Sequence, residues 1–305
     1  MSERAEIASV ARASAVDAVW RQWAALRAPV TGVAATAVVD PEALLLLSCA
    51  LRDSERRLDD VLTWWARAGA ALLSVQRVRT MARAFPESSR AGLMAFARAA
   101  AECGDTRWKS LGAAVEVDAL VSRGKRGNEP DLSAYPSLML RLRAAFSVGV
   151  KADVLAVLVA MGGADATVRG LVQATGYTPA AVRRAVQEMH AALVVRTTSH
   201  RPATYHIDIS VWASFLDLEA VEHSGWRYFA GVFAFLAAVV AWGEEGTDNG
   251  YVAASAARDI FEAHRFAFEI NRISFPEPDT APGARYLRAF GDIIPEVDGW
   301  LARNL

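Results

Sequence analysis

The stretch GYTPAAVRRAVQEMHAALVVRT, residues 176–197, decides how this chain is interpreted. Thr178 is a favourable helix N-cap and the proline after it suits the first helical position, so a helix is predicted from that point. Val182, Val186 and Met189 recur at spacings of four and three, which places them on one buried face. The β-branched run at 194–198, which closes the stretch and continues one residue past it, predicts a strand.

The neighbouring residues complete a small domain. A nearly all-round apolar run at 153–161 predicts a buried helix, and Thr167 caps a second helix that closes at Gly176. After the helix of the opening stretch, a turn at 199–202 joins the first strand to a second, alternating strand at 204–209. The predicted order is therefore helix, helix, tight turn, helix and β-hairpin.

This order, with several of its residues, resembles the winged helix-turn-helix domain of bacterial transcription regulators, in the broad group that includes MarR-like and ArsR-like proteins. The resemblance covers about residues 151–209. Its marks are Val168 and Leu171 in the second helix, Gly176 at the turn, Thr178, Val182, Arg183, Arg184, Val186 and Met189 in the third helix, and Leu193, Val194 and Arg196 entering the wing. The resemblance implies three helices plus a β-hairpin wing. The chain departs from it at Ala192, where glycine is usual, and this bears on how sharply the third helix ends.

A recognition helix buries one face on its own domain and presents the other to the major groove of DNA. The residues expected to contact bases lie on that outer face and are Ala180, Ala181, Arg183, Arg184 and Gln187. Alanine permits close approach, whereas arginine and glutamine can bond guanine and adenine through two hydrogen bonds. Phosphate contacts are expected from helix N-termini, the second helix and the wing, through Thr167, Arg169, Thr178, Arg196, His200 and Arg201.

Together these features predict sequence-specific binding of double-stranded DNA in transcriptional regulation, by a homodimer that reads a two-fold site. One open alternative is an ordinary solvated face in which Arg183 pairs with Glu188. Another is a winged helix that binds a protein, as in an adaptor, an antitoxin-like protein or another component of a defence operon. A small-molecule or protein effector is left open.

Enzyme motifs are not found in the sequence. There is no phosphate-binding glycine loop, no nucleophile elbow and no zinc-protease motif. The five histidines and two cysteines do not form a metal-binding spacing. We therefore expect neither catalysis nor a cofactor or metal.

The rest of the chain predicts a mainly α-helical protein. We expect an N-terminal helical domain at 1–123, a linker rich in Gly, Pro and Ser at 124–137, the winged helix-turn-helix domain at 138–209 and a C-terminal helical domain at 210–305. The adjacent carboxylates Asp59 and Asp60 are expected to be solvated.

Charge is unevenly spread along the chain. Residues 138–210 carry eight Arg and Lys against four Asp and Glu, whereas residues 211–305 carry seven against fourteen. The basic excess falls on the segment that holds the predicted recognition helix, which favours a nucleic-acid partner.

Compartment and membrane topology follow from two further patterns. Cys49 and Cys103 suggest reduced thiols, and the first residues lack the basic start and apolar run of an export signal, so a cytoplasmic protein is expected. The apolar run at 228–242 is 15 residues long, short of the roughly 20 that span a bilayer. It predicts a core helix or a dimer-interface helix.

Overall fold

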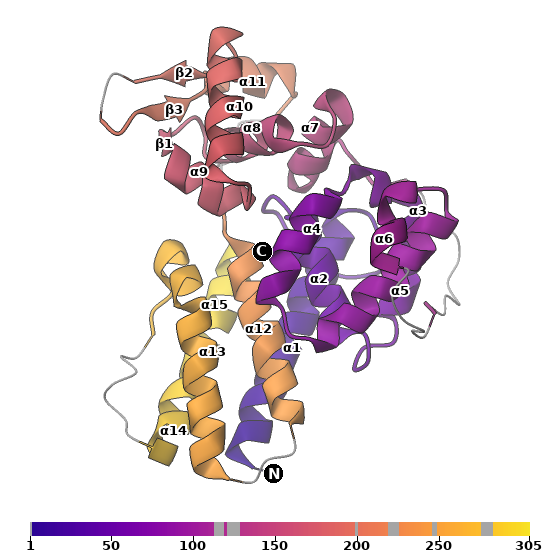
Figure 1. Ribbon diagram of the computed structural model, residues 1–305, viewed down its shortest axis with the longest axis vertical. Coiled ribbons are helices and arrows are strands. Elements are labelled where there is room, and N and C mark those ends of the chain that lie inside the picture. Colours follow the sequence, from indigo (N-terminus) through magenta and orange to yellow (C-terminus); the bar gives the residue numbers. More distant parts are fainter. Residues whose placement is uncertain are drawn as a thin grey trace.

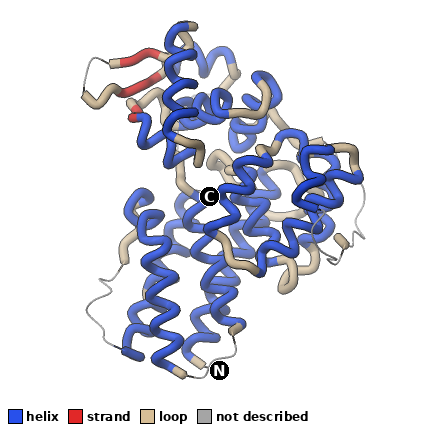
Figure 2. The backbone as a smooth tube through the Cα atoms, viewed as in Figure 1, coloured by secondary structure: helices blue, strands red, loops and turns tan. Residues whose placement is uncertain are grey.

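The computed structural model describes residues 2–112, 119–120, 129–198, 201–218, 226–245, 249–275 and 283–305. The chain is mainly helical and carries one small antiparallel sheet, at the upper left of the view in Figure 1. Figure 2 shows that the strands are confined to one end of the molecule and that helices form the rest. Within the described residues, no helix combines the length and the apolar character that crossing a membrane requires.

The N-terminal region contains six α-helices in its described part. They are α1 (Glu3–Ala25), α2 (Pro41–Leu51), α3 (Leu58–Ala68), α4 (Val75–Met81), α5 (Ser88–Glu102) and α6 (Lys109–Gly112). Three of them begin at a side chain that accepts a hydrogen bond from a backbone amide of the first turn: Ser2 for α1, Asp40 for α2 and Ser74 for α4. These caps satisfy amides that the helices leave unpaired.

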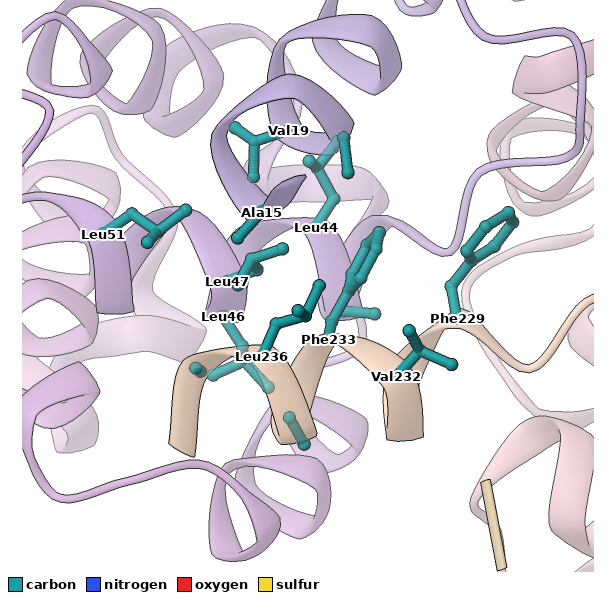
Figure 3. Packing of buried hydrophobic residues seen from close by; sticks show 14 of the residues in the cluster. Ala15, Val19, Leu44, Leu46, Leu47, Leu51, Phe229, Val232, Phe233 and Leu236 are labelled. Atoms are coloured by element: carbon teal, nitrogen blue, oxygen red, sulfur yellow. The ribbon is translucent and has the colours of Figure 1, made fainter. Parts of the chain in front are cut away.

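The described part of the C-terminal region, from residue 226 on, contains four α-helices. They are α12 (Phe229–Glu244), α13 (Gly250–Asn271), α14 (Tyr286–Gly291) and α15 (Ile293–Asn304). Of these, α12, α14 and α15 pack against N-terminal helices, while α13 packs on α12. Residues of both regions enter one hydrophobic core, in which α12 lies against α1 and α2. Figure 3 shows Phe233 and Leu236 of α12 facing Leu44 and Leu47 of α2. The division into separate N-terminal and C-terminal helical domains does not anticipate this shared core.

Helix α12 corresponds to the apolar run that predicts either a core helix or a dimer-interface helix. Its side chains are buried around the whole circumference, including Phe229, Phe233 and Trp242. Because α1, α2 and α13 surround it, α12 is a core helix of this chain.

The central segment forms a second hydrophobic core. Its helices are α7 (Leu138–Phe146), α8 (Val150–Ala160), α9 (Val168–Thr175), α10 (Pro179–Ala191) and α11 (Ile209–Phe215). The boundary predicted between residues 209 and 210 falls inside α11, directly after its first residue. Ile209 and Trp212 of this helix pack against the second core. Residues 124–128 of the predicted linker lie outside the described residues.

Three short strands make the sheet of this segment. They are β1 (Ala166–Thr167), β2 (Arg196–Thr197) and β3 (Thr204–His206), in the order β1-β3-β2 with antiparallel pairing. The strands β2 and β3 form the predicted hairpin but are shorter than the predicted 194–198 and 204–209. β1 is not predicted, because two residues before a helix carry no periodic signal.

The end of α9 and both ends of α10 have a defined geometry. Gly176 adopts a left-handed conformation (φ 71°) after α9, and the Thr178 hydroxyl accepts the amide of Ala181 at 3.3 Å to begin α10. Helix α10 ends at Ala191 with Ala192 as its C-cap, and the residue that turns left-handed is the following one, Leu193 (φ 61°). The amide of Val194 donates to the Met189 carbonyl at 2.9 Å, which closes a Schellman-type end. Leu193 thus occupies the position that glycine usually fills.

Candidate nucleic-acid interface

Helix α10 has one buried and one exposed face, as its sequence predicts. Val182 and Val186 are fully buried, and Met189 is 5% exposed. On the opposite side Ala180, Arg183, Arg184 and Gln187 are exposed, and Ala181 is half-buried at the flank. None of the described helices of the flanking regions covers this outer face.

The two adjacent arginines of α10 have different surroundings. The Arg184 guanidinium lies 2.7 Å from the Glu188 carboxylate, one turn along, and Lys151 of α8 contacts the same carboxylate at 2.8 Å. Hydrogen bonds from Lys151 and Arg184 lower the pKa of Glu188 to about 2, so this carboxylate stays ionised. Arg183 has no carboxylate within 4 Å among the described residues. The pairing with Glu188 that the sequence suggests for Arg183 is therefore made by Arg184.

Two of the predicted phosphate-contacting residues are helix caps. The hydroxyls of Thr167 and Thr178 each accept a backbone amide, from Gly170 at 3.1 Å and from Ala181 at 3.3 Å. The caps therefore fix the starts of α9 and α10, and their hydroxyl lone pairs are partly engaged.

Arginines account for the remaining predicted phosphate contacts in the described part of the chain. Arg169 on α9 and Arg201 beside the hairpin are exposed, with no carboxylate partner among the residues the structure describes. Arg196 on β2 lies 3.5 Å from Asp208. His200 is outside the described residues.

The hairpin stands beside α10 in Figure 1. Its strands are joined by the Arg196–His206 and Thr197–Tyr205 pairs, and the Thr198 and Thr204 hydroxyls lie 2.7 Å apart. The exposed face of α10, the start of α9 and the hairpin therefore belong to one compact unit, and this unit carries the guanidinium groups of all five predicted arginines.

A buried charged cluster lies where this unit meets the N-terminal helices. Its five charged side chains, each at most 5% exposed, are Asp40, Glu42, Arg77, Arg143 and Asp153. They come from the start of α2, from α4, from α7 and from α8, so the cluster joins the two hydrophobic cores. We call these five residues the buried ion network.

Two arginines hold the network together. Arg77 contacts both oxygens of Asp40, at 3.0 and 2.6 Å, and also pairs with Glu42. Arg143 contacts Glu42 at 2.6 Å and forms a two-bond pair with Asp153, at 2.6 and 2.8 Å. Such fork-like pairs fix orientation as well as charge.

The network also bonds the turn between α9 and α10. Arg77 Nε donates to the Thr175 carbonyl at 2.6 Å, and the Tyr177 hydroxyl donates to Asp153 at 2.9 Å. Burial alone would raise the pKa of Asp153, but the charge and hydrogen bonds of Arg143 outweigh it, and the pKa is lowered. Burial, and after it the charge of Asp153, raises the pKa of Tyr177, so the phenol keeps its proton.

Sequence reasoning misses this network, although a signal exists. Glu42, Arg143 and Asp153 each stand in or beside an apolar run of a predicted helix. A charge in such a position needs a buried partner. The same error affects Asp59, which is expected to be solvated but is 3% exposed and pairs with Arg52 at 2.6 Å, because α3 turns it toward α2.

Histidine, cysteine and carboxylate side chains do not gather into a metal-binding group of three or more within the described ranges. No known protein family, curated protein or solved structure matches the chain.

Proposed function

We propose that the central segment is a winged helix-turn-helix domain and that the protein binds double-stranded DNA sequence-specifically in transcriptional regulation, without catalysis. The observation that carries the proposal is the outer face of α10. It presents Arg183, Arg184 and Gln187 to solvent, and the neighbouring α9 and hairpin carry the other predicted arginines. In the proposed domain this helix enters the major groove while the hairpin contacts the adjacent backbone.

The surroundings of each arginine suggest different roles. Arg183 has no competing carboxylate among the described residues, so its guanidinium is available to pair with guanine. The Arg184 guanidinium already pairs with Glu188, so a base would have to compete with this carboxylate, which weakens the contribution of Arg184 to binding. Gln187, one turn further, suits adenine, and the short side chains of Ala180 and Ala181 permit close approach.

The backbone contacts would come from Arg169, Arg196 and Arg201. They lie on α9, which precedes α10 in the sequence, and on the hairpin, which follows it. Such contacts set register and affinity but carry no sequence information. A two-fold site would require a homodimer, which light scattering after size-exclusion chromatography would detect at micromolar concentration.

Selection of bound genomic fragments, followed by titration across salt concentrations, tests the proposal. A DNA reader should enrich a common sequence, and its affinity should fall with log[salt] at about −0.9 per phosphate contact. The triple variant Arg169→Ala, Arg196→Ala, Arg201→Ala should bind DNA more weakly with a shallower slope. Binding that is absent, or that does not change with salt, would exclude the proposal.

A second candidate function, binding of a protein partner, is favoured by an aromatic surface on the same segment. Helix α11 has no fully buried residue, and Phe215 is 66% exposed. Trp212 stacks edge-to-face with Phe215 and with Phe146 of α7, at centroid distances of 5.7 and 6.3 Å. Exposed aromatic groups of this kind are typical of protein interfaces. If Phe215→Ser abolished recovery of a co-purifying protein while no DNA bound, this second function would replace the first.

A further inference from the structure

We infer that Arg77, a residue of the N-terminal helices, is a positioning residue for α10, so that the N-terminal region sets the direction in which the DNA-reading helix points. The inference rests on the proposed function. It concerns Arg77, which the sequence pattern does not connect with DNA. The contact that carries it joins Arg77 to the turn immediately before α10.

The first point of attachment is a backbone carbonyl. Thr175 is the last residue of α9, and its carbonyl belongs to the group that a helix end leaves without a partner. Arg77 Nε donates to it at 2.6 Å. The same guanidinium is held by Asp40 and Glu42, so it cannot follow the turn without leaving two buried carboxylates. The carbonyl is thereby fixed relative to α2 and α4.

The second point of attachment is the side chain of Tyr177, two residues further along. Its hydroxyl donates to Asp153 of α8 at 2.9 Å and lies 3.4 Å from the Ser74 hydroxyl, which caps α4. Helix α10 begins at Pro179, two residues after Tyr177, with Thr178 as its N-cap. Attachment on both sides of Gly176 leaves the turn no free hinge, even though a glycine stands at its centre.

A purely stabilising role is a poor explanation for this arrangement. Burying ions costs desolvation energy, and apolar groups of similar volume often stabilise a core equally well. The bidentate arginine–carboxylate pairs fix the relative orientation of the helices that carry them, because the guanidinium is planar and its N–H groups point in fixed directions. In this molecule the pairs connect the body formed by the shared core with the turn that precedes α10.

The chain offers a matched control. Arg52 and Asp59 form another buried pair, at 2.6 Å with side chains 6% and 5% exposed, entirely within the N-terminal helices. Arg52→Lys and Arg77→Lys both keep the charge and lose the planar fork. They differ in that only Arg77 bonds the α9–α10 turn among the residues described here.

The experiment compares full-length wild type, Arg77→Lys, Arg52→Lys and Tyr177→Phe. The first measurement is the ratio of Kd on unrelated DNA to Kd on the selected fragment, which does not change when a fraction of the protein is unfolded. The second is amide hydrogen exchange over residues 168–182. Tyr177→Phe removes the hydrogen bond from the Tyr177 hydroxyl to Asp153, and it tests the attachment of the turn even if Arg77→Lys does not fold.

We expect Arg77→Lys to lower the Kd ratio about tenfold or more, since reading bases depends on alignment, and to speed exchange over 168–182. Tyr177→Phe should do both to a smaller extent, and Arg52→Lys should do neither. If Arg77→Lys and Tyr177→Phe leave the ratio and the exchange as in Arg52→Lys, the positioning role is excluded. If the wild type binds no DNA, the proposed function fails, and the exchange comparison alone decides whether Arg77 holds the turn.

Discussion

Two pairs of arginines have opposite surroundings: Arg183 and Arg184 on α10, and Arg77 and Arg143 in the buried ion network. The first pair is exposed, and of its two members only Arg184 pairs with a carboxylate, that of Glu188, among the described residues. The second pair is almost completely buried among three carboxylates. Exposed ion pairs contribute little to stability, whereas an uncompensated buried charge is costly. The comparison separates residues available for a ligand from residues that hold the fold, and each of the following predictions tests that separation.

The largest effect is expected from Arg143→Met. The substitution leaves Asp153 and Glu42 buried without their main partner, and we expect a loss of about 3–5 kcal/mol in the free energy of unfolding. Urea denaturation at neutral pH measures it. Arg184→Met is the matched exposed substitution and should change stability by at most about 0.5 kcal/mol. Equal losses in the two variants would contradict the comparison.

The second prediction concerns acid. The pKa of Asp153 is lower in the folded chain than its ordinary value of 3.8. At a pH between the folded and the unfolded pKa, the unfolded chain binds one more proton at this carboxyl than the folded chain does. The contribution of Asp153 to stability is therefore fully present above about pH 4 and is lost as the pH falls below that value. In Asp153→Asn, the slope of unfolding free energy against pH in this window should be smaller by up to about one proton. An unchanged slope between pH 5 and pH 2.5 would show that Asp153 is not held ionised.

The third prediction concerns the exposed face. Arg183→Ala should lose about 1–3 kcal/mol of binding free energy on the selected sequence and relax the preference at one position. Arg201→Ala should weaken binding to all sequences alike and reduce the salt slope by about one. Both variants should unfold within about 0.5 kcal/mol of wild type. A stability loss of several kcal/mol for Arg183→Ala would place it with the buried arginines.

The smallest effect is expected at the end of α10. Leu193 is 87% exposed and adopts a left-handed conformation, which costs a residue with a β-carbon about 1 kcal/mol. Leu193→Gly should therefore stabilise the chain by about that amount in thermal or urea unfolding. Ala192→Gly is the control, since Ala192 has a φ of −85° and glycine there should destabilise by about 0.5–1 kcal/mol. The opposite order of the two effects would show that the left-handed residue is Ala192 and not Leu193.

The features of the central segment that the sequence predicts are those determined by neighbouring residues. Thr167, Gly176 and Thr178 cap or end helices through contacts within a few residues, and the Val182 face follows from helical spacing. The exposure of the predicted base-contacting side chains follows from the same spacing. The short β1 strand is not predicted, because its pairing with β3 depends on residues nearly forty positions away.

The buried ion network could not be predicted in detail, because its partners lie far apart in the sequence. Glu42 and Arg143 are separated by 101 positions, and Arg77 and Thr175 by 98. A charge within an apolar helix indicates that a partner exists but does not identify it. The pairing of Asp59 with Arg52 shows the same limit over seven residues, because Arg52 caps the end of α2 and Asp59 lies on α3.

The shared core also constrains how the chain can fold during synthesis. Helix α1 packs against α12, yet the whole central segment lies between them in the sequence. Helix α2 also packs against α1, so only the surface of α1 that α12 covers must remain exposed until α12 has been translated, whereas the central segment can complete its own core earlier. Nascent chains that stop before α12 should accordingly expose this apolar part of α1, the kind of surface that chaperones bind.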